Sequence, residues 1–147
     1  MIKAPTSHTY FSQRLKLHYL DWGDASAETV LLIHGSQDHC HTWDWTCETL
    51  VGQYRLLVPD LRGHGDSAWA LGSSYSSLDY VYDIHQLVEQ ADLQQVHIVG
   101  HSLGGMIACL YTGLFPEKVA SLTSIEGVGA FWQEQWEKED PKARIKD

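Results

Sequence analysis

The 147-residue sequence has few cysteines, few basic residues and no long hydrophobic run. Its three cysteines are odd in number and include no C-x-x-C pair, which argues against a disulfide scaffold and favours a reducing, cytoplasmic environment. Lysine and arginine total 10 against 19 acidic residues, and the net charge of -9 disfavours nucleic acid as a partner. The apolar runs fall far short of the ~20 residues that a membrane-spanning helix needs, so we expect no membrane segment.

Two other signals are absent. The first 20 residues show no apolar stretch followed by a small-residue cleavage site, so no secretory signal is predicted. His39, Cys40, His41 and Cys47 are residue types that bind zinc, but adjacent side chains diverge and the second half of a zinc pattern is missing. We therefore predict no metal site and no cofactor.

What the sequence does contain is an alternation of short apolar runs with helical patterns. The runs are TVLLI at 29–33, YRLLVPD from Tyr54, QVHIVG from Gln95 and ASLTSI from Ala120. Short, β-branched runs of this kind predict strands that are buried on both faces of a parallel sheet. Before them, residues 9–22 alternate loosely between apolar and polar, which predicts two antiparallel strands.

Helices are predicted between these runs, at 43–51, 78–91 and 103–115. Ser76 and Asp79 have the spacing of a capping box at the start of the second helix. The third is expected to bury Ile107, Leu110, Tyr111 and Leu114. The alternation predicts an α/β fold: a mostly parallel sheet covered by helices on both faces.

The composition divides the chain at about residue 129. Residues 1–129 predict a core of about six strands, whereas residues 130–147 are mostly charged and carry three aromatic side chains, Phe131, Trp132 and Trp136. Two interpretations of this second segment stay open: the start of a lid over a pocket, or a solvated tail.

The stretch HIVGHSLGGM, from His97 to Met106, points to chemistry. Its G-x-S-x-G pattern is weak by itself, but Ser102 falls between a predicted buried strand and a predicted helix. Such a sharp turn strains the serine backbone, and it brings strand and helix so close that Gly100 and Gly104 have no room for side chains. The turn projects the hydroxyl toward the positive end of the helix dipole, as a nucleophile requires. The alternative is an ordinary helix cap.

A serine nucleophile also needs at least two donors for the oxyanion that forms. The amide of Leu103 can be one. We expect the second on the loop that leaves the strand at 29–33, where the amide of Ser36 is the candidate and that of Gln37 the fallback. The rival interpretation is that this loop is merely a turn.

Three motifs together resemble the α/β-hydrolase superfamily. They are His34–Gly35, DLRGHGDS from Asp60 to Ser67, and GHSLGG from Gly100 to Gly105. The resemblance implies that family's core without its last strands, with Ser102 as nucleophile and the amides of Leu103 and Ser36 as oxyanion hole. The resemblance also implies a structural role, not a catalytic one, for the second motif. Family members that open epoxides carry a carboxylate where this chain has Ser102, so acyl transfer to water is favoured.

The rest of the catalytic triad is not apparent. In this family the acid and then the histidine follow the serine, yet the nine histidines all lie at or before His101. Glu126 is a candidate acid, weighed against a role in lining the pocket or in ordering its loop. We therefore expect the acid and the base to be missing from this chain, as from a hydrolase cut where its lid begins, and turnover to be very low.

The predicted function is hydrolysis of a small-molecule ester, lactone or thioester through an acyl-enzyme. The alternatives are hydrolysis of a carbon–carbon bond in a vinylogous diketone, and a non-catalytic module that binds a ligand or a partner. His34, Gly35, His101 and Trp132 are the tentative substrate-binding residues. The oligomeric state stays open.

Overall fold

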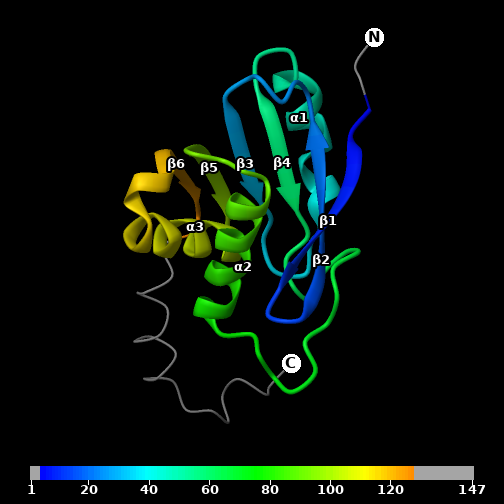
Figure 1. Ribbon diagram of the computed structural model, residues 1–147, viewed down its shortest axis with the longest axis vertical. Coiled ribbons are helices and arrows are strands. Elements are labelled where there is room, and N and C mark those ends of the chain that lie inside the picture. The colour runs from blue at the N-terminus through cyan, green and yellow to red at the C-terminus, as the bar shows by residue number, and fades with distance from the viewer. Residues whose placement is uncertain (1–3, 128–147) are drawn as a thin grey trace, which may run out of the picture.

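The computed structural model describes residues 4–127, and these contain a six-stranded sheet (Figure 1). The strands are β1 (Thr6–Ser12), β2 (Leu15–Trp22), β3 (Thr29–Ile33), β4 (Arg55–Pro59), β5 (Val96–His101) and β6 (Val119–Ile125). Their order is β1-β2-β4-β3-β5-β6. Strand β2 is antiparallel to both β1 and β4, whereas the remaining neighbours run parallel. The predicted fold class, with its mostly parallel sheet, is confirmed.

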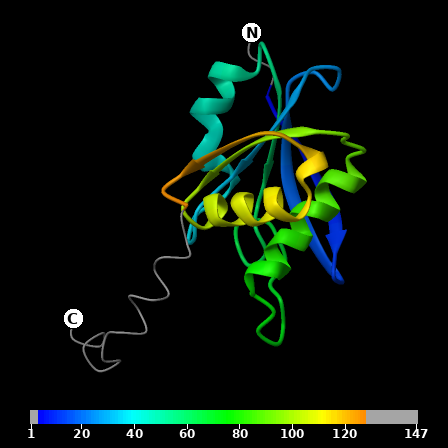
Figure 2. The same ribbon diagram turned by 90° about the vertical axis from the view of Figure 1, so that its left-hand side faces the viewer.

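Helices cover both faces of this sheet. Helices α2 (Ser77–Gln90) and α3 (Leu103–Leu114) lie on one face, and α1 (Asp44–Leu50) lies on the other (Figure 2). Short 3-10 turns precede α1 (η1, Cys40–Trp43) and follow α3 (η2, Pro116–Lys118). The predicted capping box is confirmed, because the Asp79 amide donates to the Ser76 hydroxyl and the Asp79 carboxylate accepts from the Ser76 amide.

The core is divided by the sheet into two apolar clusters. The larger one packs α2 and α3 against the sheet through side chains such as Leu31, Leu57, Ile84, Ile98 and Ile107. The smaller one packs η1 and α1 against the opposite face, with Leu32, Val58 and Cys47 among its buried members. All five residues of β3 are buried, as expected of a strand in the middle of a covered sheet.

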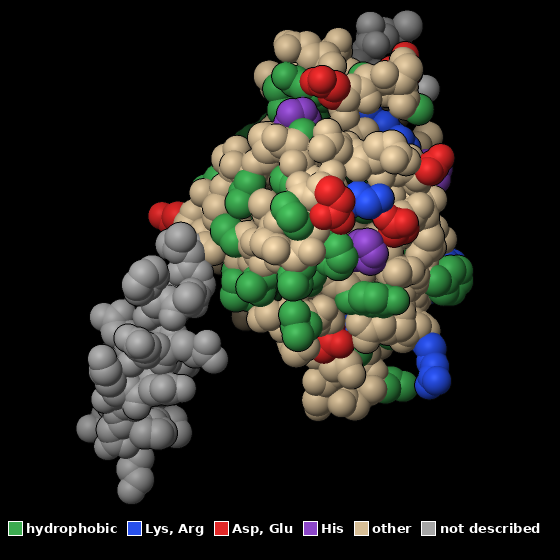
Figure 3. Space-filling model, turned by 60° about the vertical axis from the view of Figure 1, so that its left-hand side comes forward, with side chains coloured by type: hydrophobic (Ala, Val, Ile, Leu, Met, Phe, Trp, Pro, Cys, Tyr) green, Lys and Arg blue, Asp and Glu red, His purple; other side chains and the backbone are tan. Residues whose placement is uncertain are grey.

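The sheet is far less covered at β6. This strand lies at the edge, and all of its residues except the half-buried Val119 are exposed. The prediction that α3 buries Leu110 and Leu114 was wrong: these side chains are 38% and 54% exposed. Within residues 4–127 no further element packs on that side of α3, and hydrophobic side chains reach the surface there (Figure 3).

Two other predictions concern a membrane-spanning helix and the lid segment. Among residues 4–127, no helix has both the length and the hydropathy needed to cross a bilayer. The predicted lid segment at 130–147, with Trp132, lies outside the described residues.

Candidate active site

Ser102 lies on a sharp turn between β5, which ends at His101, and α3, which begins at Leu103. Its backbone has φ 51° and ψ -115°, a conformation that L-residues adopt only when the surroundings enforce it. The side chain makes no capping hydrogen bond, so the helix-cap interpretation does not hold, and the residue is half-buried. The turn is fixed by its backbone instead, because the Ser102 amide donates to the Ile125 carbonyl oxygen at 2.8 Å.

Glycines make this turn possible. A Cβ atom at Gly100 would collide with the carbonyl oxygen of Gly104, and one at Gly104 would collide with the carbonyl oxygen of Ile33. Strand β5, helix α3 and the end of β3 therefore touch backbone to backbone. This close approach was expected for both glycines and is confirmed.

The loop after β3 lies directly beside the turn. A Cβ atom at Gly35 would be 3.3 Å from the Ser102 Cβ and 3.1 Å from Nδ1 of His101, so residue 35 packs against both. Ser36 is exposed next to it. Gln37 has a left-handed backbone, with φ 60°, and its amide already donates to Nε2 of His64 at 3.2 Å. Of the two amides expected here, that of Gln37 is thus already engaged.

His34 does not face a substrate. It is completely buried, and Nε2 of its ring accepts the Leu61 amide at 3.0 Å while Nδ1 lies 2.6 Å from the Gly35 carbonyl oxygen. Both ring nitrogens are engaged within the protein. The role that the sequence suggested for His34, contact with substrate, therefore gives way to a role in holding its loop. His101 and Gly35 stay beside Ser102.

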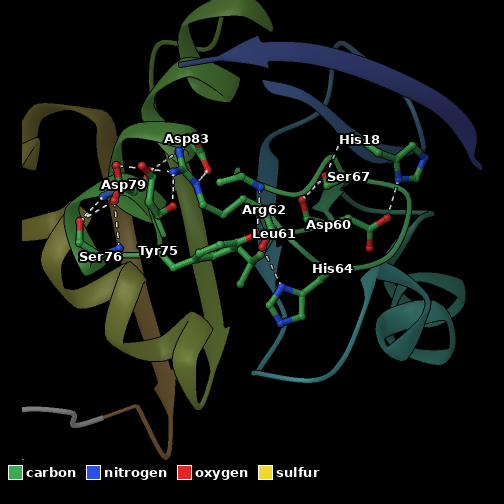
Figure 4. Close-up of polar contacts among 12 residues, drawn as sticks. His18, Asp60, Leu61, Arg62, His64, Ser67, Tyr75, Ser76, Asp79 and Asp83 are labelled. Atoms are coloured by element: carbon green, nitrogen blue, oxygen red, sulfur yellow. Dashed lines mark hydrogen bonds and ion pairs between the residues drawn. The ribbon is translucent and has the colours of Figure 1, made fainter. Parts of the chain in front are cut away.

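Asp60 is the centre of a buried polar cluster in the loop after β4 (Figure 4). Its carboxylate accepts the amides of Cys40 and Asp66, at 2.7 and 3.0 Å, and Nδ1 of His18 at 2.7 Å. Burial by itself would raise the pKa of Asp60, but these hydrogen bonds outweigh it and hold the pKa below its ordinary value. The carboxylate is therefore charged and hydrogen-bonded within the protein, which indicates a structural role.

Arg62, two residues further on, is completely buried and bound on every side (Figure 4). Its guanidinium donates to both carboxylate oxygens of Asp83 on α2, at 2.6 and 2.7 Å, and to the Ser74 carbonyl oxygen at 2.7 Å. The sequence placed Asp60 and Arg62 in a structural loop. It did not point to His18, whose side chain is brought to Asp60 only by the pairing of β2 with β4.

The ligand atoms of His18, Cys40 and Asp60 lie within 4.8 Å of one another, close enough to hold a metal ion. They do not resemble a vacant site, because the three groups already satisfy one another by hydrogen bonds. Burial and the nearby Asp60 carboxylate raise the pKa of the Cys40 thiol, which disfavours the thiolate that a metal would require. The zinc pattern weighed in the sequence shares only Cys40 with this set.

The histidines and acidic residues within 4–127 are the described candidates for a base and an acid. Within this range no hydrogen bond joins the Ser102 hydroxyl to a histidine. The histidines that contact carboxylates are His18, His41 and His97, each on another part of the molecule. Glu126 directly follows β6 and is exposed, with a left-handed φ of 53°.

Comparison with known proteins places this geometry among hydrolases. The family model described as alpha/beta hydrolase fold matches residues 29–144. A probable serine hydrolase of Drosophila melanogaster is 33% identical over 110 residues, which are 74% of this chain and 33% of that protein. Epoxide hydrolase 4 of Mus musculus is 31% identical over 112 residues, covering 76% of this chain and 31% of its own length.

Comparison with solved structures also finds enzymes of this fold. A thioesterase domain from the curacin biosynthetic pathway superposes with a TM-score of 0.78 at 30% identity, over 82% of this chain and 45% of that one. The chain spans about a third of the length of the curated relatives it matches. These three similar proteins are named as hydrolases or as a thioesterase, and their names point to different substrates.

Proposed function

This chain belongs to the alpha/beta hydrolase fold family, and from that premise we propose that Ser102 is the nucleophile of a serine hydrolase that cleaves ester-type small molecules. The observation that carries the proposal is the backbone of Ser102, strained at φ 51° on a turn with no capping role for its hydroxyl. A strained residue persists only where the surrounding structure enforces it, and such residues cluster at active sites.

The proposed reaction begins when Ser102 Oγ attacks the carbonyl carbon of the substrate and loses its proton to a base. The negative charge that develops on the carbonyl oxygen is stabilised by the amides of Leu103 and Ser36. Collapse of the tetrahedral intermediate expels the alcohol or thiol and leaves an acyl-serine, which water then hydrolyses. Leu103 is the first residue of α3, so its amide also lies at the positive end of the helix dipole.

We propose that the acid and the histidine base are supplied from outside residues 4–127. Support comes from the described histidines, none of which forms a hydrogen bond with the Ser102 hydroxyl, and from the exposed edge at β6, where further strands could add. Glu126 is kept as a less favoured acid because it follows β6 on the same edge of the sheet as Ser102. These 147 residues alone should turn over substrate slowly. We also propose a cytoplasmic location for the protein.

The substrate class follows from the nucleophile. Opening an epoxide through a covalent ester requires a carboxylate, whereas Ser102 offers a hydroxyl suited to acyl transfer. The names serine hydrolase and thioesterase among the similar proteins support an ester or thioester. Carbon–carbon hydrolysis of a vinylogous diketone is the second enzymatic candidate.

A fluorophosphonate probe tests the nucleophile. The probe should label Ser102 of this chain slowly, and added imidazole should accelerate labelling because it supplies the missing base. Ser102→Ala should lower labelling at least ~1000-fold, because only weak background reactivity remains. Labelling that is unchanged in Ser102→Ala, or absent at every imidazole concentration in the folded protein, would support the non-catalytic module instead.

A further inference from the structure

Two histidines join the loop after β3 to the loop after β4 through a reciprocal pair of hydrogen bonds. The Leu61 amide donates to Nε2 of His34 at 3.0 Å, and the Gln37 amide donates to Nε2 of His64 at 3.2 Å. Each ring thus accepts a backbone proton from the loop that carries the other ring. The two rings lie 5.2 Å apart between centroids, so they form one contact between the loops.

The hydrogen bonds define the protonation state of both rings. A ring nitrogen that accepts an N–H carries no proton, so Nε2 is unprotonated in both residues. The Nδ1 atoms lie 2.6 Å from the Gly35 carbonyl oxygen in His34 and 2.9 Å from the Arg62 carbonyl oxygen in His64. Nδ1 must therefore donate in each case. Both rings are neutral and of the same tautomer, and all four ring nitrogens are engaged.

We propose that His34 and His64 are positioning residues that hold the Ser36 amide in the oxyanion hole, and that protonation of His34 releases this loop. The proposal rests on the hydrolase function proposed above. Ser36 lies between two fixed points: Gly35, packed against Ser102, and Gln37, bound to His64. An amide held at both sides is preorganised, which is what stabilisation of an oxyanion requires.

Protonation would break the contact for a simple reason. An imidazolium ring has two N–H donors and no acceptor, so the amide of Leu61 or Gln37 would face another donor. A protein donor left without its acceptor is costly when buried, and the Leu61 amide lies in a buried setting. The loop after β3 then has to move away from the loop after β4.

The direction of the pH dependence follows from the surroundings of His34. Burial lowers its pKa, and the nearby His64 ring lowers it further, whereas the Gly35 carbonyl oxygen and the carboxylates of Asp60 and Asp38 raise it. The net effect places the pKa of His34 below its ordinary value of about 6.5. Its contribution to stability is therefore complete above about pH 6.5 and is lost as the pH falls through the lowered pKa.

Nuclear magnetic resonance of the 15N-labelled chain tests the hydrogen bonds directly. An N–H···N hydrogen bond carries a scalar coupling between its two nitrogens, so couplings are expected at pH 7.5 from Gln37 to His64 and from Leu61 to His34. The coupling from Leu61 to His34 should disappear as the pH falls through the lowered pKa of His34. The protection of the Gln37 amide from hydrogen exchange should fall at least tenfold over the same pH range. Absent couplings at pH 7.5, or Gln37 protection unchanged through the titration, would overturn the proposal.

Variants of His64 distinguish the effect of its hydrogen bond from the effect of its ring volume. His64→Gln keeps an acceptor near the Nε2 position, so Gln37 should stay protected at pH 7.5. His64→Phe keeps a ring without an acceptor, so protection should be lost at every pH. His41→Gln is the control, because His41 is exposed and lies outside this contact, with its Nδ1 2.9 Å from the Asp44 carboxylate. If His64→Phe does not fold, the titration of the unmodified chain still decides.

The link to catalysis has its own readout. At a fixed concentration of free imidazole, labelling of Ser102 by the fluorophosphonate should be at least tenfold slower in His64→Phe than in His64→Gln. Equal rates in the two folded variants would overturn the positioning role. No labelling of Ser102 in any variant would instead overturn the hydrolase function, while the couplings would still report the contact between the loops.

Discussion

The polar side chains of the loop after β4 and of the turn at Ser102 differ in burial and in hydrogen bonding. In the loop, Asp60 and Arg62 are buried, charged and bound by several partners each. At the turn, the Ser102 hydroxyl has no capping hydrogen bond, and the backbone that carries it is strained. The two regions lie at the carboxyl ends of β4 and β5, the two strands that flank β3 in the sheet, and the loop after β3 contacts both.

This difference distinguishes polar groups that have a structural role from a polar group whose presence a structural role does not explain. Buried polar groups that are completely satisfied define a single structure and have nothing left to offer a ligand. A polar group held in a strained conformation without a partner is stabilised by nothing local, so its presence has to be explained by what it does. By this criterion the polar residues of the β4 loop are supports, and Ser102 is the residue for which we propose a chemical role.

The largest effect is expected from breaking the support. Arg62→Met leaves Asp83 as a buried carboxylate without its cation, and we expect the free energy of unfolding to fall by about 4 kcal/mol. Arg55 forms a similar bidentate pair with Asp21 nearer the surface, so Arg55→Met should cost on the order of 1 kcal/mol. Urea titrations of both variants provide the comparison. Equal losses would show that burial does not distinguish the two pairs.

A somewhat smaller effect is expected from the glycines beneath the turn. Gly104→Ala forces a Cβ into the carbonyl oxygens of Ile33 and His34, and we expect a loss of about 3 kcal/mol, because backbone atoms yield less than side chains. Gly113 lies in the same helix with open space around its Cβ position, so Gly113→Ala should stabilise by about 0.5–1 kcal/mol. Thermal unfolding measures both. Similar changes at the two positions would contradict the close approach described here.

The smallest effect measures the strain itself. At Ser102, glycine tolerates φ 51° whereas alanine does not, so Ser102→Gly should be about 1 kcal/mol more stable than Ser102→Ala. In an ordinary helical position the order is reversed. Both variants lack the hydroxyl, so neither should react with the fluorophosphonate. Finding Ser102→Ala the more stable of the two would mean that the turn holds no strain.

Features that depend on neighbours in the sequence were predictable. The strand at Thr29–Ile33 was predicted with its observed bounds, because four consecutive apolar residues after a β-branched threonine leave little ambiguity. The Ser76–Asp79 capping box needs only a spacing of three residues. The turn at Ser102 likewise depends on adjacent glycines, and its place between a strand and a helix is confirmed.

Features that depend on residues far apart in the sequence were not predictable. His18 meets Asp60 across 42 positions, and His34 meets the Leu61 amide across 27, through strand pairings that no local pattern encodes. The exposure of Leu110 and Leu114 was missed for a related reason. Helical periodicity shows which face is apolar, but it does not show whether anything packs on that face.

The backbone contact of Gly100 and Gly104 also restricts how this molecule can move. Further along α3, side chains such as Ile107 separate the helix from the sheet, but at Gly100 and Gly104 the backbones touch directly. Close-packed atoms transmit displacements, so we expect the start of α3 to move together with β5 and the end of β3. Any breathing motion that admits a substrate has to arise in the loops around Ser102, so relaxation measurements should find the slow exchange there and rigid amides beneath.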